Sequence, residues 1–325
     1  MTRRPGAGAL RRNRLARQMS WQRAEGNSFH SMGKKLEHIY LDCGPPDEEI
    51  EERSCTFTYP RIGIAEWDIF YDTQELWHAG YDEEAEVAFR QLVDRFPEFI
   101  DAWHHLAMLL EDVGSEEEAF QIWEGTVAMV LDCFPDSFRP GKDRVMWGYL
   151  ENRPFLRAYH GYALALRERG RIDEALVIFE HILALNPNDN QGVRGLAAAA
   201  YFELRRPEAV LELCASYPGD GTEELVYGLP LALLQLGRAA DAERGLDRAI
   251  GEYPLIAEEL IKARHRKPPE LNPYGVALWS PEQAYLYWKS CGKYWKRTPG
   301  ALDLVRSRLQ RARDLGLAKT LELAD

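Results

Sequence analysis

The chain has 325 residues, a net charge of −12 and 46% hydrophobic residues, which is enough apolar surface for a sizeable core. Its five cysteines are scattered and form no Cys-x-x-Cys pair, so the sequence argues against a disulfide framework and a cysteine zinc site, and favours a reducing compartment. No apolar run approaches the roughly 20 residues of a membrane helix, and we therefore expect no membrane contact.

Charge is strongly segregated along the chain. Residues 1–40 carry +7 and residues 262–319 carry +9, whereas residues 41–261 carry −26. An acidic body thus lies between two basic ends. A charge distribution of this kind affects solubility and the choice of partner rather than the fold.

The first 60 residues predict no folded domain. Residues 1–35 are rich in Arg, Gly and Ser and are expected to be disordered. Two alternatives are a mitochondrial transit peptide and a translation start further on, at Met19 or Met32. Residues 43–60 contain an acidic run and are interpreted as a solvated linker or the start of a short acidic helix.

From about residue 66 a pattern recurs with a period near 34. Each of four units has a glycine, an alanine five residues later and an aromatic residue or leucine four further on, and several units end at a proline. The matching positions are Gly80, Ala85, Phe89 and Pro97; Gly114, Ala119 and Trp123; Gly170, Ala175, Phe179 and Pro187; and Gly237, Ala242, Leu246 and Pro254. Between the last two, a degenerate unit with Ala209 has lost its glycine.

This pattern resembles the tetratricopeptide repeat. The resemblance implies an all-α, right-handed solenoid of about five helix-turn-helix units, in which the alanines sit at close helix crossings and the aromatic residues fill the space between pairs. Units one and two are expected in residues 61–135 and units three to five in 156–254. Residues 255–325 should form a basic loop followed by a cap of two helices, because an open-ended solenoid requires one.

Residues 136–155 interrupt the array. They place Trp147 and Tyr149 among polar residues, and insertions in repeat arrays map to loops. The two rings either cover the seam between units two and three or contact a partner.

The resemblance also implies which residues face the concave groove. In such repeats these positions lie on the first helix of each pair. They carry over to His104, Met108, Arg157, His160, Gln191, Arg194 and Tyr227. Arg157, His160, Gln191 and Arg194 are expected to form a polar, basic centre, which suits a carboxylate or phosphate group on an extended peptide, unless these side chains pair with neighbouring acids.

No motif predicts catalysis or a cofactor. Adjacent His104 and His105 point about 100° apart on a helix and do not converge on a metal. There is no phosphate-binding glycine loop, no nucleophile elbow and no paired-carboxylate cleft. We therefore expect no enzyme activity, no cofactor and no metal.

The sequence thus favours a cytoplasmic scaffold or adaptor that holds a protein or peptide partner in its groove. The alternative is a regulatory or nucleic-acid-associated module working through the C-terminal helices, where lysines alternate with aromatic residues such as Tyr285, Trp288 and Trp295. Buried rings and cations lying against the acidic body would explain the same residues, so nucleic acid is the less favoured partner. Partner identity and oligomeric state do not follow from the sequence.

Overall fold

A computed structural model describes residues 38–47, 51–268 and 275–316. It contains two compact units, unit 1 up to Val193 and unit 2 from Arg194 onward. The division falls at the start of a helix. The repeat pattern has no break there, so the sequence did not predict the division. Each unit is described by itself below.

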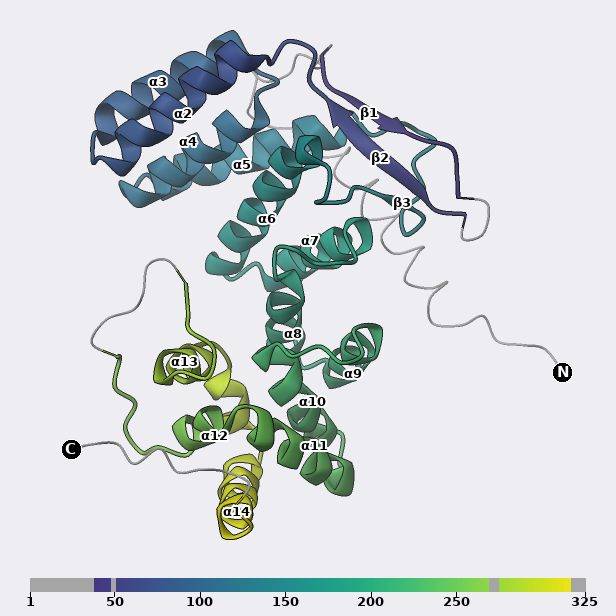
Figure 1. The fold of residues 1–325 in the computed structure, drawn as a ribbon, viewed down its shortest axis with the longest axis vertical. Coiled ribbons are helices and arrows are strands. Elements are labelled where there is room, and N and C mark those ends of the chain that lie inside the picture. Colours follow the sequence, from purple (N-terminus) through teal and green to yellow (C-terminus); the bar gives the residue numbers. More distant parts are fainter. Residues whose placement is uncertain (1–37, 48–50, 269–274, 317–325) are drawn as a thin grey trace, which may run out of the picture. The chain divides into compact units, whose positions relative to one another are not determined.

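Unit 1 contains three antiparallel helix pairs. They are α2 (Ile64–His78) with α3 (Asp82–Arg95), α4 (Ile100–Asp112) with α5 (Glu116–Leu131), and α6 (Arg153–Glu168) with α7 (Ile172–Leu185). The pairs stand out in Figure 1 as successive coiled ribbons joined by tight turns. The expected all-α class and its helical pairs are confirmed.

The repeat alanines and rings form the core of these pairs. Ala85, Ala119 and Ala175 are fully buried, and so are Phe89 and Phe179. Fully buried alanines are expected where two helix backbones approach closely, since a larger side chain there would overpack by about 1–3 kcal/mol.

The turn glycines have the left-handed backbone that their role requires. Gly80, Gly114 and Gly170 have φ of 84°, 86° and 74°, a region that costs other residues about 1–2 kcal/mol. The residues after Gly114 have the sequence pattern of a capping box, Ser115 with Glu118, but Ser115 makes no side-chain cap. Glu118 instead accepts a hydrogen bond from Arg90 at 2.8 Å.

Residues 40–43 and 53–58 form two paired β-strands, which corrects the expectation of a solvated linker or an acidic helix. Strand β1 (Tyr40–Cys43) pairs antiparallel with β2 (Arg53–Thr58), with Tyr40 opposite Thr58. A short third strand, β3 (Asp143–Arg144), lies parallel to β2 on its other side. Cys55 and Phe57 alternate toward the interior, as a half-buried strand requires.

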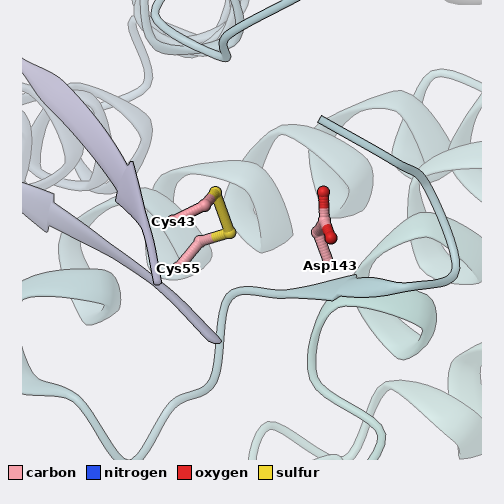
Figure 2. A group of neighbouring side chains, drawn as sticks. All are labelled: Cys43, Cys55 and Asp143. Atoms are coloured by element: carbon pink, nitrogen blue, oxygen red, sulfur yellow. A yellow bond between two sulfur atoms is a disulfide. The ribbon is translucent and has the colours of Figure 1, made fainter. Parts of the chain in front are cut away.

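A disulfide joins Cys43 of β1 to Cys55 of β2, contrary to the expectation from cysteine spacing. Figure 2 shows it beside Asp143, and ligand atoms of the three residues lie within 4.8 Å of one another. The two sulfurs are bonded to each other, and Asp143 accepts hydrogen bonds from Arg53 and Arg139. These groups therefore brace the sheet, and their atoms are already engaged.

Asn152 fastens the sheet to the helices. It lies in a 3-10 turn, η1 (Leu150–Asn152), and is fully buried. Its amide oxygen accepts from the backbone N–H of Phe57, and its amide nitrogen donates to the carbonyls of Cys55 and Met146, each at 3.0 Å. One side chain from the insertion thus holds β2 itself against the start of α6.

Unit 2 continues with two more helix pairs. They are α8 (Val193–Glu203) with α9 (Pro207–Ser216) and α10 (Glu223–Gln235) with α11 (Ala239–Glu252). In the pair without a turn glycine, Arg205 takes the left-handed conformation instead, with φ of 54°. Its alanine, Ala209, is only partly buried, whereas Ala242 in the next pair is fully buried.

Three further helices complete unit 2. They are α12 (Pro254–Leu260), α13 (Pro281–Arg297) and α14 (Ala301–Asp314), and α13 packs on α10 and α12 while α14 packs on α11 and α12. Helix α13 starts with an N-cap, in which the Ser280 hydroxyl accepts from the Gln283 N–H at 3.1 Å. Among the described residues, no helix is long and apolar enough to span a membrane.

Candidate partner-binding cavity

A cavity of about 730 Å³ lies within unit 1. The first helices of its three pairs, α2, α4 and α6, contribute to its lining together with the loop after β2 and the η1 turn. The lining residues are Tyr59, Ile62, Trp67, Phe70, Tyr71, Gln74, Glu98, Phe99, Ile100, Asp101, His105, Leu150, Glu151, Arg153, Pro154 and Arg157. We call this site the unit-1 cavity. Its volume is in the range of about 300–1,000 Å³ typical of ligand pockets.

One wall of the cavity is aromatic. The Trp67 ring packs edge-to-face on Phe99 at 4.9 Å between centroids and stacks on Tyr71 at 5.7 Å. Phe70 packs edge-to-face against His105 at 4.9 Å. Tyr71 remains 55% exposed, so this wall offers a free ring face to an incoming group.

Two buried carboxylates lie in the same cavity, each beside one guanidinium group. Asp101 is 1% exposed and accepts from Arg157 at 2.5 Å, and Glu98 is 1% exposed with its Oε1 3.2 Å from the Arg61 Nε. The other Asp101 oxygen, Oδ1, is buried and has no hydrogen-bond partner among the described residues. A buried acceptor without a partner carries a cost of about 1–3 kcal/mol that a bound donor would relieve.

The histidines near the cavity are neutral at pH 7. Burial lowers the pKa of His105, and burial followed by the proximity of His105 and Arg157 holds the pKa of His104 well below its usual range. Because these rings carry no charge, the ionic character of the cavity comes from its carboxylates and guanidinium groups.

Of the predicted groove residues in unit 1, Arg157 alone lines the cavity. His104 is instead packed in the core, where its Nδ1 accepts from the Trp123 indole at 3.1 Å. Met108 is 37% exposed elsewhere on α4. His160 is on α6 but outside the cavity lining, and burial lowers its pKa to about 4. The Gln191 amide nitrogen lies 3.5 Å from the His160 Nδ1 and donates to the Leu156 carbonyl.

The other two groove residues belong to unit 2 and are already engaged there. Arg194 lies 2.7 Å from a carboxylate oxygen of Asp220, and its guanidinium covers the Tyr217 ring. Tyr227 is fully buried, and its hydroxyl donates to the Tyr253 carbonyl at 2.7 Å. The arginines of the expected basic centre are thus paired with acids, which is the alternative that the sequence left open, and its histidine is neutral. Partner binding by these residues stays a prediction.

The two rings of the insertion have different surroundings. Trp147 is half-buried beneath the guanidinium groups of Arg153 and Arg157, whose centres lie 5.3 and 5.7 Å from its ring centroid. Tyr149 is 43% exposed. Trp147 thus contacts the guanidinium groups of two cavity residues. Contact of either ring with a partner stays a prediction.

Sequence reasoning missed most of the cavity. Trp67, Tyr71 and Gln74 lie on the first helix of the array, while Tyr59 and Glu151 come from segments without a repeat pattern. One sequence signal for the aromatic wall was available. Residues 67–71 contain three aromatic residues, which is more than one buried helix face needs.

The C-terminal helices present fewer free groups than the sequence suggested. Tyr287, Tyr294 and Trp295 are buried in unit 2. Lys293 and Arg297 both pair with Glu203, at 2.8 and 3.0 Å. This arrangement removes three rings and two cations from the set that would contact a nucleic acid.

The fold and the cavity define a class: a tetratricopeptide-like helical-repeat protein with a lined concave site. The family model for Tcf25, described as transcriptional repressor TCF25, matches residues 79–295, which is 217 of the 325 residues. The chain therefore belongs to the Tcf25 family. The repeats are tetratricopeptide-like in structure, as the resemblance implied, and the matching family model is that of Tcf25.

Comparison with curated proteins found no significant match. Among solved structures, a tetratricopeptide repeat protein from Parabacteroides merdae is 13% identical, with 78% of this chain and 88% of that chain covered and a TM-score of 0.45. The MamA protein is 15% identical, with 61% and 96% covered and a TM-score of 0.43. YrrB, a tetratricopeptide protein with an unusual peptide-binding site, is 14% identical, with 70% and 98% covered and a TM-score of 0.40.

Proposed function

We propose that this protein is a non-catalytic interaction module that binds an extended segment of a protein partner in the unit-1 cavity. The observation that carries the proposal is the cavity itself, about 730 Å³ with an exposed ring and buried carboxylates in one enclosure. It is lined by the first helices of three successive pairs, and such stacked repeats present concave binding surfaces. A scaffold role, without enzyme activity or cofactor, follows from this proposal.

A second candidate is a regulatory role in transcription, favoured by the description of the Tcf25 family. The two roles are compatible, since a repressor can act by holding another protein. Direct nucleic-acid contact through α13 has less support, because Lys293 and Arg297 are paired and the Trp295 ring is buried. The cytoplasmic location expected from the sequence stays a prediction that cell fractionation would decide against a nuclear one.

Site-specific photo-crosslinking tests the proposed function. A benzophenone amino acid replaces Gln74, which lines the cavity, and in a matched chain it replaces Asp72, which is exposed on the same helix outside the lining. We expect a discrete protein adduct from position 74 and none from position 72, with the partner and its crosslinked segment identified by mass spectrometry.

The adduct at position 74 should disappear when Tyr71→Ala is added, because that change removes the exposed ring of the cavity wall. Equal adducts from positions 72 and 74, or an adduct that survives Tyr71→Ala, would contradict a partner site in the cavity. The double change Arg157→Glu with Arg194→Glu is a poorer test, because the first would set a glutamate against buried Asp101 and disturb the fold.

A further inference from the structure

The unit-1 cavity has unused hydrogen-bond acceptors at its buried end. Asp101 Oδ1 has no partner, and the Glu98 Oε1 has an ion-pair contact with Arg61 but no hydrogen bond. Both side chains are almost fully buried, so water does not readily replace the missing donor. An occupant that brings donors to these oxygens would be stabilised more than one that brings acceptors.

The charged groups of the cavity offer an anion no free partner. Its three carboxylates are Glu151, Asp101 beside Arg157 and Glu98 beside Arg61, and His105 is neutral. Neither guanidinium of the lining is idle: Arg157 donates to Asp101, and the Arg153 Nε donates to the Trp147 carbonyl at 3.1 Å. Residues 41–193 of unit 1 carry −20, which adds a long-range attraction for basic segments.

The aromatic wall suits an aliphatic stem that ends in a charge. Trp67 and Tyr71 form a stacked pair, and Tyr71 presents an open face. Methylene groups pack on such rings, and a cation near a ring face is attracted by its quadrupole. A lysine ammonium is a compact charge with three donors, which suits two separate acceptors, whereas a planar guanidinium suits a bidentate partner best.

From these contacts we propose that the unit-1 cavity selects a lysine side chain of its partner, with the ammonium on the carboxylates of Asp101 and Glu98 and the stem along the rings of Trp67 and Tyr71. This rests on the proposed function and names the chemistry of its partner. It also reverses the anionic ligand that the sequence suggested. A carboxylate or phosphate in the same place would meet Glu98, Asp101 and Glu151 with both arginines already engaged.

The test uses the full chain and four fluorescein-labelled octapeptides in fluorescence anisotropy. The peptides share a Gly, Ser and Leu sequence and differ at one central residue: lysine, norleucine, arginine or glutamate. Norleucine keeps the stem and removes the charge. We expect the lysine peptide to bind at least tenfold more tightly than the norleucine and glutamate peptides, and several-fold more tightly than the arginine peptide.

Variants place the binding in the cavity. Tyr71→Ala should weaken the lysine peptide about three- to tenfold, while Tyr81→Ala, at a tyrosine 54% exposed outside the lining, should leave it unchanged. Glu151→Gln should weaken it about two- to threefold, with Glu84→Gln, at an exposed glutamate outside the lining, as the control. Both tested residues are exposed, so these variants are expected to fold.

The outcomes separate this inference from the proposed function. Arginine or norleucine binding as tightly as lysine, or glutamate binding more tightly, would overturn the lysine preference; if that binding still depends on Tyr71, the partner site stands. Lysine binding that ignores Tyr71→Ala would overturn both. If no peptide binds up to millimolar concentration, the lysine preference fails, and the crosslink from position 74 decides the proposed function separately.

Discussion

Replacing Asn152 by alanine should destabilise unit 1 strongly, because this side chain joins the sheet to the helices. The change leaves the buried Phe57 N–H without its partner, which costs about 1–3 kcal/mol, and removes two further hydrogen bonds worth about 0.5–1.5 kcal/mol each. The Met146 carbonyl keeps a bond from the Tyr149 N–H, so its loss is at the low end. We therefore expect a loss of about 3 kcal/mol in the free energy of unfolding.

Urea unfolding followed by circular dichroism measures this loss. With a slope of about 1–3 kcal/mol/M, the midpoint of the first transition should fall by at least about 1 M. Asn190→Ala serves as the control, since Asn190 is exposed and makes one weak side-chain contact, at 3.4 Å. The reasoning is refuted if Asn152→Ala stays within 0.5 kcal/mol of the parent chain.

Three further changes test the packing and the titration of the fold. Gly161→Ala should cost about 1–3 kcal/mol, because the new Cβ would lie 2.8 Å from the Trp123 indole nitrogen; thermal unfolding checks this, and an unchanged midpoint would contradict it. Arg205→Gly should stabilise the chain by about 0.5–1 kcal/mol by relieving a left-handed backbone, and a loss in the same assay would count against it. Burial lowers the pKa of His160 and His181 to about 4 from an ordinary 6.5, so the unfolded chain binds more protons between these values. Stability should therefore be full above pH 6.5 and decline as pH falls toward 4, and His181→Gln should flatten this decline in urea titrations at each pH.

The helix pairs were predictable because their signals are local. Gly170, Ala175 and Phe179 indicate a turn, a close helix crossing and a buried ring within ten residues. The structure places all three as expected. The sheet was not predictable in the same way. Its strands are four, six and two residues long, and β3 meets β2 across a separation of 90 residues between Arg53 and Asp143.

The disulfide was missed for a related reason. Cysteine spacing along the chain carries no information once a hairpin brings Cys43 opposite Cys55. The sequence argument looked for a short Cys-x-x-Cys motif, whereas these residues are 12 apart and meet by strand pairing. The pairing follows from the register of β1 and β2, which the acidic run between them obscured.

Little of the candidate cavity was predictable from the sequence. The repeat resemblance indicated the first helices of the pairs, and of the predicted groove residues in unit 1 only Arg157 lines the cavity. Its charge was misjudged because its partner, Asp101, is on the preceding pair, 56 residues away. Ion pairs of this kind depend on which helices are neighbours and on how deeply each side chain is buried, and neither is written in a single repeat.

Hydrogen–deuterium exchange on the full chain, with and without the partner crosslinked through position 74, tests the central claim most directly. The account predicts that bound partner slows exchange in residues 59–78, 98–105 and 150–157, which line the unit-1 cavity, and leaves residues 281–314 unchanged. Protection confined to residues 281–314, with the cavity segments exchanging as in the free chain, would contradict it.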